Sequence, residues 1–210
     1  ILIGEAAKAQ ITDVFPIMYI AMGVFAVAFF VLWAVSIPEP QLAAKSDEPM
    51  GQLMAGALKF RHFVLGAIAI FVYVGVEIGV PGTLNLWLSD ASNPAGAQVG
   101  KTIAGFVAGT YWFLMLIGRL AGAALGSKIS SGKMLTVASA VGLVLILLTI
   151  FLSPEIKVDL PVLQRSAAGA LSFGLAEVPI NAMFIVLVGL CTSIMWGGIF
   201  NLAVEGLGKY

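Results

Sequence analysis

Charge is scarce in this sequence of 210 residues: Asp, Glu, Lys and Arg make up only 10%, and 60% of the residues are hydrophobic. Soluble domains average about a quarter charged residues, so the composition indicates a membrane protein. The formal net charge is zero, and no block of basic residues occurs. We therefore expect no nucleic-acid partner, because phosphate backbones are bound by clustered Lys and Arg.

Cysteine and histidine are equally scarce, with Cys191 and His62 the single examples. One cysteine cannot form an intrachain disulfide, and this pair cannot supply a Cys/His metal cluster. Cys191 lies in an apolar run, where a small core residue is expected rather than a nucleophile. The chain does not begin with Met, and no signal-peptide pattern precedes its first apolar run, so we expect a fragment of a longer protein.

Long apolar runs are abundant. Five segments reach the length of about 20 apolar residues that a bilayer-crossing helix requires: 14–37, 63–88, 102–127, 134–153 and 178–204. The predicted fold class is all-α, a polytopic membrane helix bundle with five transmembrane helices. The stretches IPEPQLAAKSDEPMG, LSDASNPAGAQVGK and SPEIKVDLPVLQRS have the composition of loops. Residues 50–60 predict a short cytoplasmic surface helix, and LSFGLAEVP a loop or a short interfacial helix.

The distribution of basic residues predicts the orientation of the spans. One set of alternating loops and span ends holds seven of the 11 Lys and Arg residues, and the other set holds four together with most of the acidic residues. By the positive-inside rule the first set is cytoplasmic. The N-terminus is then expected outside and the C-terminus inside.

The second span contains a carboxylate, Glu77, in the run FVYVGVEIGVPGTLNLW. An ionised carboxylate in a bilayer costs on the order of 2.5 kcal/mol or more, so such residues generally face a bundle interior or a wet cavity. Tyr73, Glu77, Pro81 and Asn85 step by four and share one helix face. This stripe offers the donors and acceptors that sugar hydroxyls require. The alternative is a protonated Glu77 that serves packing alone.

The last span repeats this pattern, since Ser193, Gly197 and Asn201 also step by four, with Trp196 beside them. Gly82–Leu86 and Gly198–Leu202 both follow the pattern G-x-x-N-L. The two spans are three helices apart, which is the period of the inverted repeats in some secondary transporters.

The third span ends in GRLAGAALGSKISSGK, where Gly118, Gly122 and Gly126 form a small-residue face suited to close helix packing. Arg119 lies in this apolar end, about two turns before Lys128. We expect Arg119 and Lys128 to act as a conformational gate, with Arg119 in an interhelical charge contact. The alternative for Arg119 is snorkelling to the cytoplasmic interface.

Three stretches resemble one known family: YVGVEIGVPGTLNLWL at 73–88, GRLAGAALGSKISSGK at 118–133 and SIMWGGIFNLAVEGLGKY at 193–210. They look like segments of the fucose/glucose–galactose symporter branch of the major facilitator superfamily. The resemblance implies helices 6 to 10 of a twelve-helix transporter. Residues 1–40 would hold an outer loop and the last helix of the N-terminal half, 41–60 the cytoplasmic link, and 61–210 the first four helices of the C-terminal half.

The resemblance further implies cation-coupled hexose transport by alternating access in a bacterial inner membrane, with glucose or galactose favoured over fucose by Glu77. Bound cofactors are not expected, and the coupling ion would be H⁺ or Na⁺. The partners would be a small sugar, the lipid bilayer, and the missing N-terminal and C-terminal helices of the same chain. Glu77, Asn85 and Asn201 would hydrogen-bond the sugar, with Trp196 and Tyr73 against its apolar faces.

Three alternatives stay open. A drug or organic-cation antiporter of the same fold would use Glu77 to attract a positive substrate. The 210 residues alone would be an inactive fragment if half of the cavity lies elsewhere. An integral-membrane enzyme acting on lipid or sugar-phosphate needs clustered acids or histidines, and no second acid or histidine occurs within a span.

Overall fold

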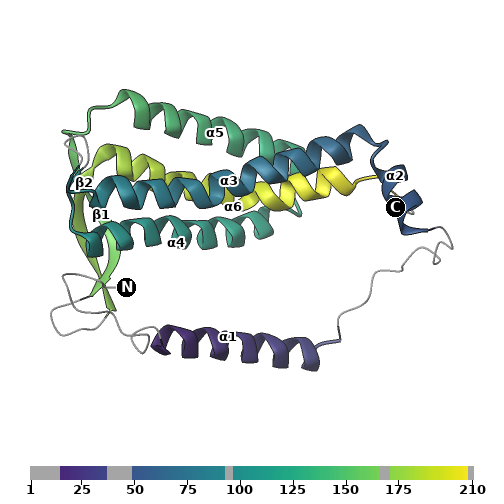
Figure 1. Ribbon diagram of the computed structural model, residues 1–210, viewed down its shortest axis with the longest axis horizontal. Helices are drawn as coiled ribbons and strands as arrows, with labels where there is room; N and C mark the ends of the chain where they lie inside the picture. Colours follow the sequence, from purple (N-terminus) through teal and green to yellow (C-terminus); the bar gives the residue numbers. More distant parts are fainter. Residues whose placement is uncertain (1–14, 37–48, 93–96, 166–170, 208–210) are drawn as a thin grey trace.

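The computed structural model describes residues 15–36, 49–92, 97–165 and 171–207, which form six helices and one two-stranded hairpin. In chain order these elements are α1 (Phe15–Ala34), α2 (Met50–Ala57), α3 (Arg61–Ser89), α4 (Lys101–Leu125), α5 (Ser131–Phe151), β1 (Lys157–Arg165), β2 (Leu171–Pro179) and α6 (Ile180–Val204). Helices α3 to α6 form an elongated bundle, the hairpin lies at one end, and α1 lies apart from the bundle (Figure 1).

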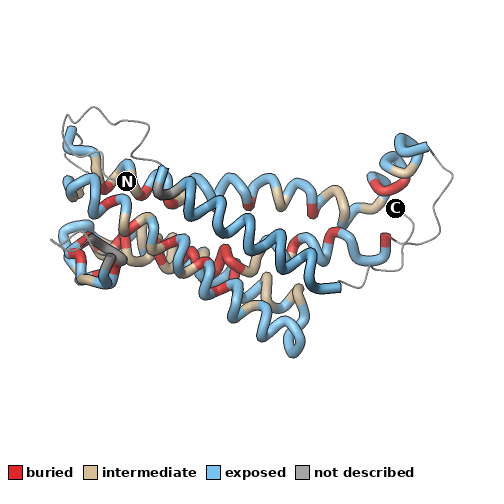
Figure 2. The backbone as a smooth tube through the Cα atoms, turned by 90° about the horizontal axis from the view of Figure 1, so that it is seen from below, coloured by how far each residue is buried: buried red, intermediate tan, exposed pale blue. Residues whose placement is uncertain are grey.

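Four helices, α3 to α6, are long and apolar enough to cross a membrane, and α1 contains the shorter apolar helix Met18–Ala34. All five predicted spans are therefore apolar helices, with ends within three residues of the predicted ones. Exposed side chains are often large and apolar, such as Phe71 at 81% and Phe151 at 79% exposure. Figure 2 shows long exposed stretches of the helices. Such a surface suits acyl chains, because lipid imposes no cost on exposed apolar groups. The chain is a polytopic helical membrane protein.

Helix α6 is the central element of the bundle, in contact with α3, α4 and α5. Helix α4 runs in the same direction as α6, and α3 and α5 run in the opposite direction. The start of α3 and the ends of α4 and α6 therefore share one end of the bundle (Figure 1). Lys59, Arg61, Lys128 and Lys133 belong to this end, as the sequence predicts. Which end faces the cytoplasm stays a prediction.

The segment after α5 differs from the sequence-based expectation. SPEIKVDLPVLQRS was expected as a loop and LSFGLAEVP as a loop or a short interfacial helix, and the structure shows that both expectations are wrong. The two form an antiparallel hairpin, paired from Lys157 opposite Pro179 to Arg165 opposite Leu171. The alternating residues Leu160, Val162, Ala176 and Val178 are buried in a cluster with residues of α3, α4 and α6.

The burial of one face explains why this short hairpin forms despite Pro161 in its first strand. Alternation of apolar and polar side chains over five residues favours a half-buried strand. A two-stranded sheet consists of edges only, so a proline can point its ring nitrogen away from the ladder.

Glycines bring α4 and α6 close together. A Cβ at Gly189 would lie 2.5 Å from the backbone oxygen of Tyr111, and one at Gly118 would collide with Ser193. A Cβ at Gly122 would collide with Ile194, whereas one at Gly126 would meet only backbone of its own helix. The small-residue face predicted on α4 is thus confirmed for Gly118 and Gly122 but not for Gly126.

Candidate functional site

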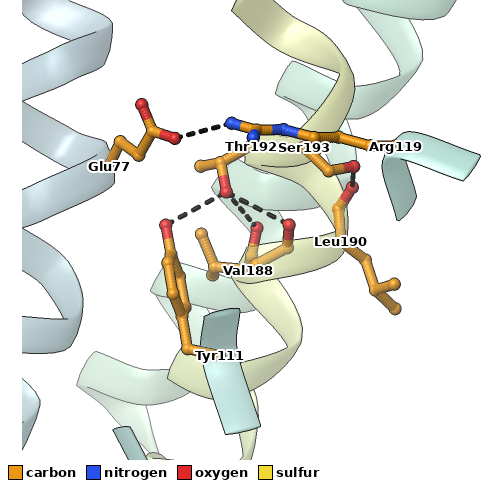
Figure 3. Close-up of polar contacts among 8 residues, drawn as sticks. Glu77, Tyr111, Arg119, Val188, Leu190, Thr192 and Ser193 are labelled. Carbon is orange, nitrogen blue, oxygen red and sulfur yellow. Dashed lines mark hydrogen bonds and ion pairs between the residues drawn. The ribbon is translucent and has the colours of Figure 1, made fainter. Parts of the chain in front are cut away.

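Glu77 of α3 forms a salt bridge with Arg119 of α4, in which Nη2 donates to Oε1 at 2.9 Å. The Glu77 side chain is 16% exposed and the Arg119 side chain is 54% exposed. The pair joins two helices that the sequence separates by 42 residues. Figure 3 shows the two side chains reaching toward each other from their helices. The interhelical charge contact expected of Arg119 is therefore present, and its partner is Glu77.

The stripe that contains Glu77 faces the interior of the bundle. Tyr73 and Pro81 are buried, and Glu77 and Asn85 are partly buried. Helix α3 runs through Pro81 without a break. Because proline lacks an N–H, the carbonyl oxygen of Glu77, four residues earlier, loses its usual helical partner. The stripe thus turns the carboxylate of Glu77 toward α4, where Arg119 binds it.

Tyr73 lies one helical turn before Glu77 on α3, with only 3% of its surface exposed. Its hydroxyl interacts electrostatically with Glu77 and Arg119, but it forms no hydrogen bond of standard geometry within the described residues. The tyrosine also lines a cavity of about 390 Å³ between α3, α5 and α6. A buried hydroxyl that lacks a well-formed hydrogen bond costs free energy, so a polar ligand or a water that reached this group would gain by binding it.

A cavity of about 510 Å³ opens beside the ion pair, lined by Glu77, Arg119, Ser193, Trp196 and Gly197. Trp196 is 47% exposed, and its ring stacks on Phe200 with centroids 5.4 Å apart and an interplanar angle of 2°. The absent side chain of Gly197 leaves this wall open, since a Cβ there would meet nothing within 4 Å. Three helices therefore place a carboxylate, a guanidinium and an indole around one cavity.

A second cavity of about 310 Å³ adjoins the first and shares Arg119, Ser193 and Gly197 with it. Asn201 lies on the wall of this second cavity and is exposed. Asn201 and Glu77 thus border neighbouring cavities that meet at Arg119.

Two of the predicted residues lie away from this centre. Asn85 is two turns beyond Glu77, roughly 12 Å along the helix axis, and borders none of the cavities described above. Lys128 lies in the turn after α4, where its backbone N–H donates to the carbonyl of Leu125. Within the part of the chain that the structure describes, Lys128 forms no salt bridge. The roles predicted for Asn85 and Lys128 stay predictions without support from the geometry.

Ser193 is a residue of this site that sequence reasoning placed on a polar stripe but did not assign a role. It borders both cavities, and its hydroxyl donates to the carbonyl oxygen of Leu190 at 2.6 Å. Beside it, Thr192 and Tyr111 are joined by a buried hydrogen bond of 3.0 Å (Figure 3). The spacing of Ser193, Gly197 and Asn201 was the available signal. Nothing in the sequence pairs Tyr111 with Thr192, which is 81 residues away.

The arrangement suits a neutral polar ligand. The other carboxylate oxygen of Glu77, Oε2, lies outside the contact of Oε1 with Arg119, and a guanidinium has donors beyond the one it uses here. The two opposite charges lie in contact, so they offer hydrogen-bond donors and acceptors without a net charge. A polyhydroxy compound presents both hydroxyl groups and apolar C–H faces, for which an exposed indole plane is a suitable surface. Among the described residues, no group of three or more His, Cys, Asp or Glu could hold a metal ion.

Comparison with known proteins places the chain beside sugar transporters. It is 33% identical over 199 residues to a protein named "Glucose/galactose transporter" from each of two Brucella abortus strains, 9-941 and 2308. A Helicobacter pylori J99 protein that is also named as a glucose/galactose transporter is 28% identical to this chain over 191 residues. These alignments cover 93% and 90% of this chain, respectively.

Neither a family model nor a solved structure matches the chain. The chain spans only about two fifths of the length of the curated relatives it matches, 40% for the Brucella proteins and 39% for the Helicobacter protein. Within that span, nearly the whole of this helical membrane chain is similar to proteins named as glucose/galactose transporters.

Proposed function

We propose that this chain is part of a secondary active sugar transporter that moves a hexose such as glucose or galactose together with a cation. The observation that carries the proposal is the cavity bordered by the Glu77–Arg119 pair and Trp196 in a chain similar to named glucose/galactose transporters. The relatives are named as transporters and not as enzymes, which speaks against the enzyme alternative. Transport would proceed by alternating access around a site near the bilayer midplane.

In this proposal Glu77 accepts hydrogen bonds from sugar hydroxyls, Arg119 orients the carboxylate and donates to the sugar, and Trp196 lies against a C–H face. Tyr73, one helical turn before Glu77 on α3, supplies a further hydroxyl. Asn201 contacts the part of the sugar that extends into the adjoining cavity. Aromatic walls with a few fixed polar groups are the usual composition of small-molecule sites. Asn85 would contribute only if the helices rearrange during transport.

We propose further that the full-length protein belongs to the fucose/glucose–galactose branch of the major facilitator superfamily. The chain would then correspond to helices 6 to 10, in a bacterial inner membrane. The coupling ion would be H⁺ or Na⁺. Helices supplied by the rest of such a protein would complete the cavity, and the 210 residues alone would not transport.

The ion pair also discriminates against the antiporter alternative. A lipophilic cation is attracted by an unpaired buried carboxylate, whereas Glu77 already has Arg119 as its counter-ion at 2.9 Å. A cation entering this cavity would meet the half-exposed guanidinium, and like charges at close range repel. A neutral sugar meets no such penalty.

The direct test is uptake by the complete reading frame reconstituted in vesicles, with labelled glucose, galactose and N-acetylglucosamine, with and without sodium and a pH gradient. We expect saturable hexose uptake that unlabelled hexose inhibits and that lipophilic cations do not. Glu77→Gln should reduce uptake sharply while membrane insertion is retained, and Glu177→Gln on the exposed face of the hairpin is the matched control. Unchanged transport kinetics in Glu77→Gln would exclude Glu77 from the site, and cation exchange without hexose uptake would favour the antiporter.

A further inference from the structure

The short helix α2 precedes α3 by only three residues, Leu58, Lys59 and Phe60. Figure 1 shows α2 turned across the long axis of the bundle, at the end where α3 begins and α6 ends. Because α3 is long and apolar enough to cross a bilayer, a helix three residues before it lies close to one bilayer surface. Its orientation across the bundle axis makes it roughly parallel to that surface.

One face of α2 is apolar and uncovered. Met50, Met54 and Leu58 step by four and therefore lie on one side of the helix, with exposures of 72%, 61% and 58%. Gly56 and Ala57 are buried. Gln52 is also exposed and lies nearly opposite the apolar stripe in the helical projection. A short helix with one apolar side, next to a span, has the form of an interfacial helix.

Basic residues follow the apolar stripe directly. Lys59 and Arg61 are exposed, and neither forms a salt bridge within the described ranges. Glu205, exposed at the end of α6, is the nearby described acid at this end of the bundle, and it is not paired with them. Asp47 and Glu48 precede α2 in the sequence but lie outside the described residues. Two unpaired cations beside an apolar stripe are complementary to anionic headgroups above acyl chains.

We propose that α2 and its junction with α3 form a binding surface for anionic phospholipid. The stripe of Met50, Met54 and Leu58 enters the boundary between headgroups and acyl chains, and Lys59 and Arg61 bind lipid phosphates. This surface is independent of the sugar site, which lies within the bundle. It anchors the start of α3, the helix that carries Glu77, at a fixed depth in the bilayer.

The test uses the full chain in vesicles of phosphatidylcholine, alone or mixed with phosphatidylglycerol. In a Cys191→Ala background, an environment-sensitive fluorophore is attached at Met54→Cys, and in a second protein at Gln52→Cys as the matched control. We expect nitroxide lipids to quench the probe at position 54 and aqueous acrylamide to quench the probe at position 52. Equal access of acrylamide to both probes would overturn the proposal. So would protection of position 54 from both quenchers, because protein would then cover the stripe.

The second arm tests the charge. Phosphatidylglycerol should increase lipid quenching of the probe on α2, and Lys59→Gln with Arg61→Gln should remove this increase. The association of α2 with anionic lipid should weaken roughly fivefold for each cation lost. Lys101→Gln with Lys157→Gln removes the same charge from the opposite end of the bundle and should leave the probe unchanged. An increase that survives the loss of Lys59 and Arg61, or that disappears equally in the control, would refute binding of anionic lipid at this junction.

Discussion

Removal of one partner of the Glu77–Arg119 pair should destabilise the bundle much more than removal of both. In Arg119→Gln the carboxylate of Glu77 remains, with only 16% of its side chain exposed and its counter-ion gone. An unpaired charge at the centre of a membrane helix costs on the order of 2.5 to 3.5 kcal/mol on insertion scales. Arg119 is 54% exposed in its cavity, so water screens part of this interaction. We therefore expect a loss of about 1 to 3 kcal/mol in the free energy of unfolding.

The double variant Glu77→Gln with Arg119→Gln isolates the interaction itself. With no charge left at either position, the double variant should be more stable than the sum of the two single losses predicts, by about 1 kcal/mol or more. The assay is a double-mutant cycle on reversible unfolding in mixed micelles, followed by circular dichroism of the helices. Lys133→Gln serves as the control, since Lys133 is exposed and has no salt bridge among the described residues. It should change stability by less than about 0.5 kcal/mol.

Additive losses would refute the reasoning. If the two single losses sum to the double loss within about 0.5 kcal/mol, the two charges do not stabilise each other in the folded protein. A strongly destabilised Arg119→Gln variant that Glu77→Gln does not rescue in the double variant would instead indicate that Arg119 has another partner. Uptake measured in the full-length variants then separates the roles, because restored stability without restored uptake in the double variant assigns the ion pair to the ligand as well as to the fold.

Three further outcomes are expected. Gly189→Val should disrupt the α4–α6 contact and destabilise the bundle in the same unfolding assay, because a Cβ there falls 2.5 Å from the backbone oxygen of Tyr111. Gly105→Ala is the control: a Cβ at Gly105 would meet nothing within 4 Å, so this substitution should stabilise the bundle or leave it unchanged. Asn181→Ala removes two hydrogen bonds, of 2.6 and 2.9 Å, to carbonyls at the end of α5. It should lower the free energy of unfolding by about 1 to 3 kcal/mol and increase hydrogen exchange at that end of α5. Unchanged hydrogen exchange there would show that the two contacts are dispensable. Trp196→Ala should raise the KM for hexose several-fold in the full-length protein and Trp196→Phe much less, and equal kinetics in both would remove the indole from the site.

The membrane spans were predictable because each depends on local composition. A run of about 20 apolar residues can satisfy its backbone in lipid only as a helix, so hydropathy alone located α3 to α6 within three residues. The inward face of α3 was also predictable, since the step of four from Tyr73 to Asn85 puts the polar residues on one side. The observed burial of Tyr73 and Pro81 follows that expectation.

The hairpin was missed because its stability is not local. Its strands contain Pro161 and several charged residues, and the sequence pattern resembles a loop. An isolated hairpin of two strands is marginal in water, and this one is held by Leu160, Val162, Ala176 and Val178 in the cluster it shares with α3, α4 and α6. Only the presence of that apolar surface selects strands over a loop.

The sequence by itself determined that this protein is a helical membrane protein and that one carboxylate lies within it, because hydropathy and helical period are properties of neighbouring residues. Tertiary structure alone decided the partner of that carboxylate. Arg119 is 42 residues from Glu77, and its contact depends on how closely α4 approaches α6 and α3. Glycines set the approach of α4 to α6, through the space that a missing Cβ leaves for the facing helix. Whether an intramembrane charge is paired, and which cavity it borders, is thus fixed by packing between segments far apart in the chain.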